Sequence, residues 1–458
     1  MKPTLAAGAA VLLLACGGVG TTTTASVTTT TTGTSAAPTT TTSALLDSRQ
    51  IYQTVSPSLA YVDGDLGTGS GIVIDERYVL TNLHVIWPGS TATVTLTNGV
   101  VVEDAPIVAI DWMADLAVIE VESSDALPAP AELANAVDLP IGSEVYLVGY
   151  PADSTRDPVP AITAGVLSRV RMWPNADLEF IQSDASISGG QSGGALVSET
   201  GEVIGLSGLS IGDGGLALSL SSPDVVKLVE QMLSGEDRWN LGSRVLGDLV
   251  GETVNSTVIP NFLAEAVFTF DGEAGDPHTF NISADHPSSA YVTAADGFLE
   301  GSLEDTDDGD QIEVELGIDG TFFLSVIPII DYDVTVDIST DVQLRLMSDP
   351  DHAVDLSAGM TYFGNADYPG DWDWFGMELQ EGDEITILVT TAAMDPGIAV
   401  DWVGNSGDEF VAIDSDSAGG VLGYDAEVTF TAPVTGSYII SITDESSYGP
   451  GGYILEVS

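Results

Sequence analysis

Short runs in which apolar and polar residues alternate dominate this chain, and such a period of two predicts strands. Thr93 to Thr97 alternates in this way and leads into Asn98-Gly99, a pair that is typical of a hairpin turn. The same alternation recurs far downstream, from Tyr332 to Val336 and from Tyr453 to Val457. The pattern therefore predicts an all-β protein.

One segment has the helical period instead. Apolar residues between Val225 and Leu233 fall on one side of a helix, and Ser222-Pro223 before them is a typical helix start. A shorter amphipathic segment, Leu45 to Tyr61, leads into the first strands. We expect a strand-rich domain that ends in the later helix, near residue 240.

Candidate chemistry centres on Ser192, which stands among four glycines in Gly189-Gly190-Gln191-Ser192-Gly193-Gly194. Flanking glycines allow the backbone to turn sharply, so that free amide groups can point at one spot beside the hydroxyl. Most clusters of glycine and serine are simply loops, and this pattern alone does not decide between the two interpretations.

Two upstream segments favour the catalytic interpretation. Thr81-Asn82-Leu83-His84-Val85 places a histidine where a strand ends, and Asp115 directly precedes the apolar run Leu116 to Ile119. A serine nucleophile needs a base such as imidazole, and the imidazole needs a carboxylate to fix its tautomer. His84 could instead be a core histidine and Asp115 a turn residue, but the three residues rarely arise in this order by accident.

These segments resemble the trypsin-like serine proteases of the HtrA/Deg type. Further stretches match that family in the same order: Gly67-Thr68-Gly69-Ser70-Gly71, Val148-Gly149-Tyr150-Pro151, Thr163 to Ser168 and Gly201 to Leu206. The resemblance covers about residues 45–240 and implies a trypsin-like double β-barrel protease domain there.

The resemblance also assigns roles to individual residues. His84 would be the general base, Asp115 would orient it and Ser192 would be the nucleophile. The amides of Gly190 and Ser192 would form the oxyanion hole. Gln191 departs from the family, which usually has asparagine there, and its uncharged side chain cannot form an ion pair with a newly cut amino terminus. Activation by such a cut is therefore not expected.

The primary specificity pocket is expected, again by resemblance, to include Ser186, Ile187, Ser207 and Gly208. No carboxylate stands at the Ser186 position, so a lysine or arginine side chain of a substrate has no evident partner there. We expect small or medium aliphatic side chains to be preferred, unless the packing of the surrounding loops sets the pocket.

The net charge of the chain limits the classes of partner that it can bind. Its 458 residues include 69 acidic and 10 basic ones, which gives a formal net charge of −59. Electrostatic binding of nucleic acid needs Lys and Arg for the phosphates, so this composition excludes it, and it also disfavours anionic membrane surfaces. We expect a protein or peptide substrate as the partner, and no cofactor.

The amino-terminal segment indicates export. An apolar run from Leu5 to Ala15 is too short to span a membrane, and Cys16, the single cysteine, follows it. Leu13-Leu14-Ala15-Cys16 resembles a bacterial lipobox, so residues 1–16 are interpreted as a signal peptide with lipid on Cys16, and the Thr-rich residues 17–44 as a disordered tether. We expect an extracellular protein, anchored at the cell surface through Cys16 or, after ordinary cleavage, simply secreted.

The carboxyl-terminal half is a separate compositional region that contains an internal repeat. Residues 245–458 hold 42 acidic residues and one basic residue. Gly320 to Val326 recurs as Gly436 to Ile442, and short alternating strands between Gly, Asp and Pro turns predict antiparallel sandwiches. We therefore expect two β-sandwich domains, 245–340 and 341–458, which resemble bacterial pre-peptidase C-terminal domains, the first being divergent.

One acidic turn in this half, around Asp305, Asp307, Asp308 and Asp310, has carboxylates that could bind calcium. The spacing of an EF-hand loop is only partly met, because Thr306 stands at its third position. An acidic surface turn before a strand is the preferred interpretation, so no metal is assigned.

Together these observations predict a secreted or surface-anchored serine endopeptidase that hydrolyses peptide bonds through an acyl-enzyme at Ser192. The alternative is a cell-surface binding protein in which the protease fold is catalytically incidental. The complete set of His84, Asp115 and Ser192 argues against that alternative, because a decayed enzyme need not keep all three.

Overall fold

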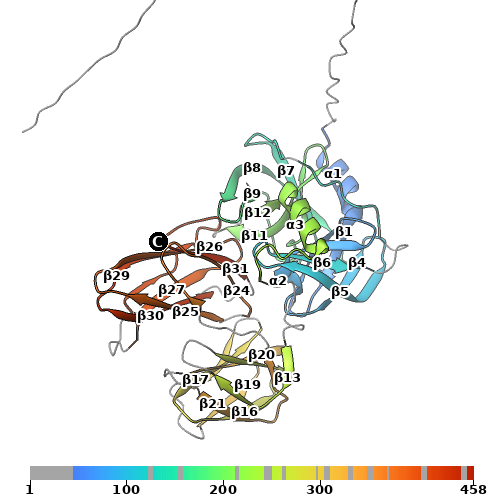
Figure 1. The fold of residues 1–458 in the computed structure, drawn as a ribbon. Coiled ribbons are helices and arrows are strands. Elements are labelled where there is room, and N and C mark those ends of the chain that lie inside the picture. The colour runs from blue at the N-terminus through green and yellow to red at the C-terminus, as the bar shows by residue number, and fades with distance from the viewer. Residues whose placement is uncertain are drawn as a thin grey trace, which may run out of the picture. The chain divides into compact units, whose positions relative to one another are not determined.

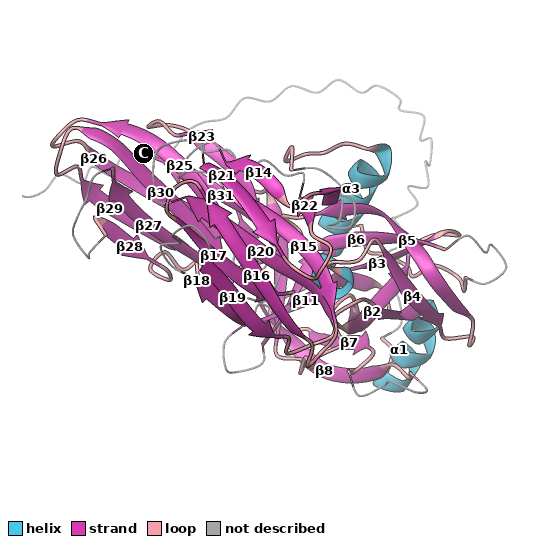
Figure 2. Cartoon of the chain, turned by 90° about the horizontal axis from the view of Figure 1, so that it is seen from below, coloured by secondary structure: helices cyan, strands magenta, loops and turns pink. Residues whose placement is uncertain are grey.

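A computed structural model describes residues 45–458 apart from the gaps 122–126, 136, 153–157, 212–215, 242–249, 260–264, 296–297, 304–309, 329–333, 348–353, 369–370, 404–409 and 445–450. The predicted signal peptide and tether, with Cys16, therefore lie outside the described residues. Strands dominate the described chain and helices are few (Figure 2). The prediction of an all-β fold is confirmed.

The amino-terminal part begins with a short helix, α1 (Ser48–Val55), and the 3₁₀ turn η1 (Ser56–Ser58), and then forms a closed barrel (Figure 1). Asp47 caps α1, because its carboxylate accepts a hydrogen bond from the N–H of Gln50 at 2.8 Å. The six strands are β1 (Leu59–Asp63), β2 (Thr68–Val73), β3 (Tyr78–Thr81), β4 (Thr91–Leu96), β5 (Val101–Asp111) and β6 (Leu116–Glu120). They follow the order β1-β2-β3-β6-β5-β4, and every second residue of β4 is buried, as its alternation predicts.

A second closed barrel follows, with the order β10-β11-β12-β9-β8-β7. Its strands are β7 (Glu144–Gly149), β8 (Ala161–Trp173), β9 (Leu178–Ser183), β10 (Ala195–Ser198), β11 (Val203–Ile211) and β12 (Leu216–Ser221). The predicted helix is α3 (Ser222–Ser234), which buries Val225 and Leu228 and ends at Gly235 in the left-handed conformation. The predicted double β-barrel is confirmed (Figure 1).

The two barrels share one buried apolar core. Leu80 and Leu116 of the first barrel belong to the same cluster of buried side chains as Val148 and Leu206 of the second. The rings of Tyr61 and Tyr150 meet edge to face, with their centroids 5.7 Å apart. This shared core fixes the position of one barrel against the other, so side chains from the two barrels keep a fixed geometry at their interface.

The next part of the chain forms a sandwich of two antiparallel sheets (Figure 1). One sheet contains β13 (Val250–Thr253), β22 (Arg345–Met347), β15 (Ala266–Gly272), β20 (Gly320–Pro328), β17 (Ser288–Ala294) and β18 (Leu299–Leu303), in that order. The other contains β14 (Ser256–Ile259), β21 (Val334–Ser339), β16 (Pro277–Ala284) and β19 (Asp310–Glu315). The boundary predicted at residue 340 is too early, because β22 pairs with both β13 and β15 and so belongs to this first sandwich.

A second sandwich of two sheets follows. Its first sheet has the order β23 (Val354–Asp355), β25 (Trp372–Leu379), β30 (Gly436–Asp444), β27 (Pro396–Trp402) and β28 (Ala412–Asp414). Its second sheet has β24 (Thr361–Ala366), β31 (Gly451–Val457), β26 (Glu384–Thr391) and β29 (Ala426–Thr431). The repeated motifs occupy matching strands, since β15 pairs with β20 in the first sandwich as β25 pairs with β30 in the second.

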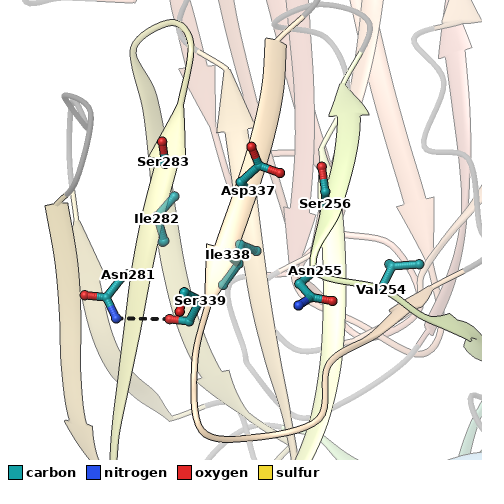
Figure 3. A pocket seen from close by; sticks show the side chains of 9 residues that line it. All are labelled: Val254, Asn255, Ser256, Asn281, Ile282, Ser283, Asp337, Ile338 and Ser339. Carbon is teal, nitrogen blue, oxygen red and sulfur yellow. Dashed lines mark hydrogen bonds between the residues drawn. The ribbon is translucent and has the colours of Figure 1, made fainter.

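The four-stranded sheet of the first sandwich carries an open hollow of about 590 Å³ (Figure 3). Asn281 lies in it and donates a hydrogen bond from its side-chain amide to the carbonyl oxygen of Ser339 at 3.1 Å. Asp337 is the one ionisable residue of its lining, so the hollow offers no catalytic pair. Within the described residues, no helix has the length and apolar character needed to cross a membrane.

The core of the first sandwich generates a stability prediction. Phe270 is fully buried and stacks on Phe322 at 5.4 Å, so Phe270→Ala should leave a cavity and cost about 3–5 kcal/mol of unfolding free energy. The matched control is Phe298→Ala, because Phe298 belongs to the same sandwich but is 71% exposed. Chemical denaturation measures both, and equal effects of the two substitutions would contradict the assignment of the core.

Candidate active site

His84 and Asp115 form a close polar pair, as the sequence predicts. His84 lies in α2 (Leu83–Ile86), a single helical turn after β3, and Asp115 ends the loop between β5 and β6. The Nδ1 atom of His84 and the Oδ2 atom of Asp115 are 2.6 Å apart. The other carboxylate oxygen, Oδ1, accepts a hydrogen bond from the backbone N–H of His84 at 2.9 Å. The carboxylate therefore fixes both the ring and the backbone of the histidine.

The backbone of Asp115 is held by the residues just before His84. Its carbonyl oxygen accepts hydrogen bonds from the N–H of Leu83 at 3.2 Å and from the side-chain amide of Asn82 at 2.9 Å. Asp115 has a left-handed φ of 51°, which costs a residue other than glycine about 1 kcal/mol. The conformation of the loop is therefore determined by its contacts and not by the preference of Asp115 itself.

The surroundings of His84 set its protonation. The side chain of His84 is 30% exposed and that of Asp115 is 7% exposed. Burial by itself would lower the pKa of the imidazole, but the charge and the hydrogen bond of Asp115 raise this pKa above its ordinary value. The pair thus favours the imidazolium, the form that a base reaches when it takes a proton from a hydroxyl.

Ser192 lies at the interface of the barrels, in the loop before β10. Its carbonyl oxygen accepts a hydrogen bond from the N–H of Ser70 in β2 at 2.7 Å. Gly69 fills the narrow space between the two sides, because a Cβ atom there would lie 2.5 Å from Cγ1 of Val85 and 3.2 Å from the carbonyl oxygen of Ser192. The turn that carries His84 and the loop that carries Ser192 therefore meet at one place.

The hydroxyl of Ser192 does not bond to the imidazole in this structure. It donates to the carbonyl oxygen of Gly208 at 3.1 Å, and among the described residues no hydrogen bond joins Ser192 to His84. Hydrogen bonds between catalytic groups are often long or misaligned before substrate binds. A rotation of the Ser192 side chain away from Gly208 would be needed to bring the two groups together.

The loop before Ser192 leaves amide groups free. Gly190 has a φ of 86°, and a Cβ atom there would lie 2.5 Å from the nitrogen of Ala152 and 2.7 Å from the carbonyl oxygen of Tyr150, so only glycine fits. In the part of the chain that the structure describes, neither the amide of Gly190 nor that of Ser192 donates to a protein oxygen. Two free amides beside a hydroxyl are the donors that an oxyanion needs.

Two buried polar side chains support this loop, and the sequence reasoning missed their roles. The Ser70 hydroxyl donates to the carbonyl oxygen of Gly190 at 2.8 Å and accepts from the N–H of Tyr150 at 2.7 Å. Gln191 is 1% exposed, and its side-chain oxygen accepts from the N–H and the hydroxyl of Ser188 at 2.8 and 3.1 Å. An uncharged Gln191 therefore braces the loop internally, without a partner at an amino terminus.

The predicted pocket residues fall into two groups. Ser207 is fully buried and Gly208 is half-buried, and both adjoin Ser192, since the N–H of Gly193 donates to the Ser207 carbonyl oxygen at 2.7 Å. Ser186 is exposed and Ile187 half-buried, and their segment is tied to β8 by a hydrogen bond from the hydroxyl of Thr163 to the carbonyl oxygen of Ser186 at 2.8 Å. No hydrogen bond among the described residues joins the two groups.

The acidic turn considered for calcium cannot be located. Asp305, Asp307 and Asp308 lie outside the described residues, and Asp310 begins β19 with a side chain that is not described. In the second sandwich, the carboxylate of Asp414 accepts hydrogen bonds from the N–H groups of Glu427 at 2.9 Å and Ser417 at 3.2 Å. Among the described residues no group of three His, Cys, Asp or Glu side chains has the geometry of a metal site.

The electrostatics of His84 generate a prediction that needs no substrate. Asp115→Asn removes the negative charge that raises the pKa of His84. The effect of burial then remains, so this pKa should fall below its ordinary value. Asp75→Asn is the matched control, since Asp75 lies in an exposed turn of the same barrel and accepts only from nearby amides. NMR titration of the imidazole measures both variants, and an unchanged pKa in Asp115→Asn would contradict the assigned pair.

Comparison with known proteins adds an independent line of support. Residues 69–206 match the family described as a trypsin-like peptidase domain. The serine protease Do-like HtrA of Bacillus subtilis is 32% identical over 184 residues, which are 38% of this chain and 40% of that protein. The serine endoprotease DegS of Escherichia coli is 39% identical over 147 residues, 31% of this chain and 39% of that protein.

The chain thus spans less than half the length of either curated relative. A solved HtrA-type protease, AlgW with decapeptide, is 21% identical with a TM-score of 0.37, covering 42% of this chain and 69% of that one. The family match covers most of the two barrels and includes His84, Asp115 and Ser192. The barrels of this chain form a trypsin-like peptidase domain with homologues among the HtrA and DegS serine proteases.

Proposed function

We propose that this protein is a secreted or surface-anchored serine endopeptidase that hydrolyses peptide bonds through an acyl-enzyme. The observation that carries the proposal is the His84–Asp115 pair, 2.6 Å apart, at the place where the loop of Ser192 joins the other barrel. The match of residues 69–206 to a trypsin-like peptidase domain supports it. The inferred substrate is a protein or peptide, because the site offers the groups that acyl transfer from an amide requires.

The first step assigns a role to each member of the site. Substrate binding turns the Ser192 hydroxyl from the Gly208 carbonyl oxygen toward His84, and its oxygen attacks the peptide carbonyl carbon. His84 takes the hydroxyl proton on the ring nitrogen that faces away from Asp115. Asp115 keeps the opposite nitrogen protonated and stabilises the imidazolium that forms.

The amides of Gly190 and Ser192 receive the negative oxygen of the tetrahedral intermediate. Since neither amide is occupied by another described residue, both can donate without breaking an existing bond. His84 then gives its proton to the leaving amine, and the peptide bond breaks to leave an ester on Ser192. In the second half of the reaction, His84 deprotonates a water molecule that attacks this ester, and it returns the proton to the Ser192 oxygen as the acid product leaves.

The pocket favours uncharged side chains in the substrate. Asp184, the acidic residue closest in sequence to Ser186, accepts a hydrogen bond from the N–H of Val166 at 2.6 Å, which commits one of its oxygens to the backbone. Ser207 and Gly208 present a small wall beside Ser192. We infer that small or medium aliphatic side chains bind between these residues and Ile187.

The catalytic assignment predicts that Ser192→Ala loses on the order of 10⁴-fold or more in turnover of a peptide and no longer reacts with a serine-directed covalent probe. Ser210→Ala is the matched control, because Ser210 is an exposed serine in the neighbouring strand β11. Peptide hydrolysis and probe labelling of the purified full chain decide the matter. A wild-type protein that is folded but inert toward the probe would favour the alternative of a binding protein on an incidental protease fold.

The location is proposed from the amino-terminal sequence. A mature chain that begins at Cys16 with lipid on its sulfur would hold the enzyme at the cell surface, since a diacylglycerol supplies the two chains that stable anchoring needs. Cys16→Ser should then move the protein from the membrane fraction to the medium. Intact mass and fractionation measure this, and wild-type protein found wholly in the medium with another amino terminus would mean simple secretion.

A further inference from the structure

The loop that presents Asp115 is backed by a strand from the far end of the chain. The carbonyl oxygen of Trp112 accepts a hydrogen bond from the N–H of Gly452, in β31 of the second sandwich, at 3.1 Å. A Cβ atom on Gly452 would lie 2.7 Å from the sulfur and 2.9 Å from the backbone nitrogen of Met113, which is fully buried. Strand β31 therefore packs directly on the backbone of this loop, and only glycine permits the approach.

A second route connects the same loop to the neighbouring strand β24. Asp111, at the start of the loop, accepts hydrogen bonds from the N–H of Ala114 at 2.9 Å and from the indole N–H of Trp239 at 3.2 Å. The Trp239 ring packs against Phe363 of β24, with their centroids 5.4 Å apart. The start and the middle of the short loop before Asp115 are thus in contact, directly or through one side chain, with one sheet of the second sandwich.

This sheet is firmly attached to the protease barrels, which lie with it in one compact unit. The indole N–H of Trp173 donates to the hydroxyl of Thr390 at 3.0 Å, and Arg171 donates to the carbonyl oxygen of Val421 at 2.7 Å. Ile454 of β31 is fully buried in the same apolar cluster as Met113. Within the sandwich, Gly452 is itself held by a hydrogen bond from the hydroxyl of Thr391 at 2.8 Å.

We propose that the second sandwich is a positioning part of the active site, in which Gly452 and Phe363 hold the loop that places Asp115 against His84. This inference deepens the proposed function and rests on it. The hydrogen bonds from Leu83 and Asn82 hold the carbonyl oxygen of Asp115, whereas Gly452 contacts the residues just before it. A displacement of about 1 Å at a catalytic group can cost on the order of 10²-fold in rate, so a backing strand bears directly on turnover.

The test compares Gly452→Ala with Gly436→Ala in the full chain. Gly436 is a matched control, because it begins β30 of the same sandwich and a Cβ atom there would meet nothing within 4 Å. Gly452→Ala should lower kcat for a peptide by about 10- to 100-fold with little change in KM, while Gly436→Ala should leave both unchanged. Phe363→Ala removes the ring contact with Trp239 and should lower kcat in the same way. This second variant keeps the test valid if Gly452→Ala does not fold.

A second readout separates positioning from general stability. Among the described residues, Asp115 is the charged group that acts on the imidazole of His84, so a displaced loop should lower the pKa of His84 and move the acid limb of kcat/KM to lower pH. NMR titration of His84 follows this without any substrate. Folded Gly452→Ala and Phe363→Ala proteins with wild-type kcat and an unchanged pKa would overturn the inference. A wild type that is inert to substrate and probe would instead refute the proposed function, and the titration would still test the positioning.

Discussion

The bond between the imidazole of His84 and the carboxylate of Asp115 is the constraint on which the rest of the site depends. It joins a helical turn after β3 to a loop before β6, and both of these are ends of strands in a closed barrel. Asp115 has a left-handed backbone where this bond forms, and its carbonyl oxygen is held by Leu83 and Asn82. A barrel suits this purpose, since its closed hydrogen bonding leaves the strand ends little freedom.

The nucleophile comes from the other barrel, so the interface between the barrels is a second constraint. Ser70 bonds across this interface through its N–H and its hydroxyl. Its N–H donates to the Ser192 carbonyl oxygen, and its hydroxyl bonds to both Gly190 and Tyr150. Its own carbonyl oxygen accepts from the hydroxyl of Thr81 at 2.7 Å, at the end of β3. One buried serine therefore links the strand that leads to His84 with the loop that carries Ser192.

The sequence predicts those parts of the fold whose cause is local. Alternation marks β4, a Ser-Pro start marks α3, and the motifs around His84, Asp115 and Ser192 mark the pair and the loop. Contacts between residues far apart in the chain produce no such local sequence pattern. Nothing in the neighbourhood of Gly452 indicates that it lies against Met113, and no local pattern indicates that Ile454 is buried in the same apolar cluster as Met113. The short strand β22 was placed outside the first sandwich for the same reason, since only its partners β13 and β15 define it.

Among the described residues, no ion pair joins the second sandwich to the barrels. Residues 245–458 carry 42 acidic side chains with one basic one, and the residues before them carry 27 acidic with nine basic ones, so both parts are negative and repel each other. The contacts that oppose this repulsion are apolar packing around Met113 and hydrogen bonds such as those of Trp173 with Thr390, Arg171 with Val421 and Asn175 with Glu456. Salt screens repulsion between exposed charges that lie farther apart than about 10 Å at 0.1 M or about 3 Å at 1 M, but it weakens buried packing very little. Raising the salt concentration therefore removes the force that separates the sandwich from the barrels and leaves the force that joins them.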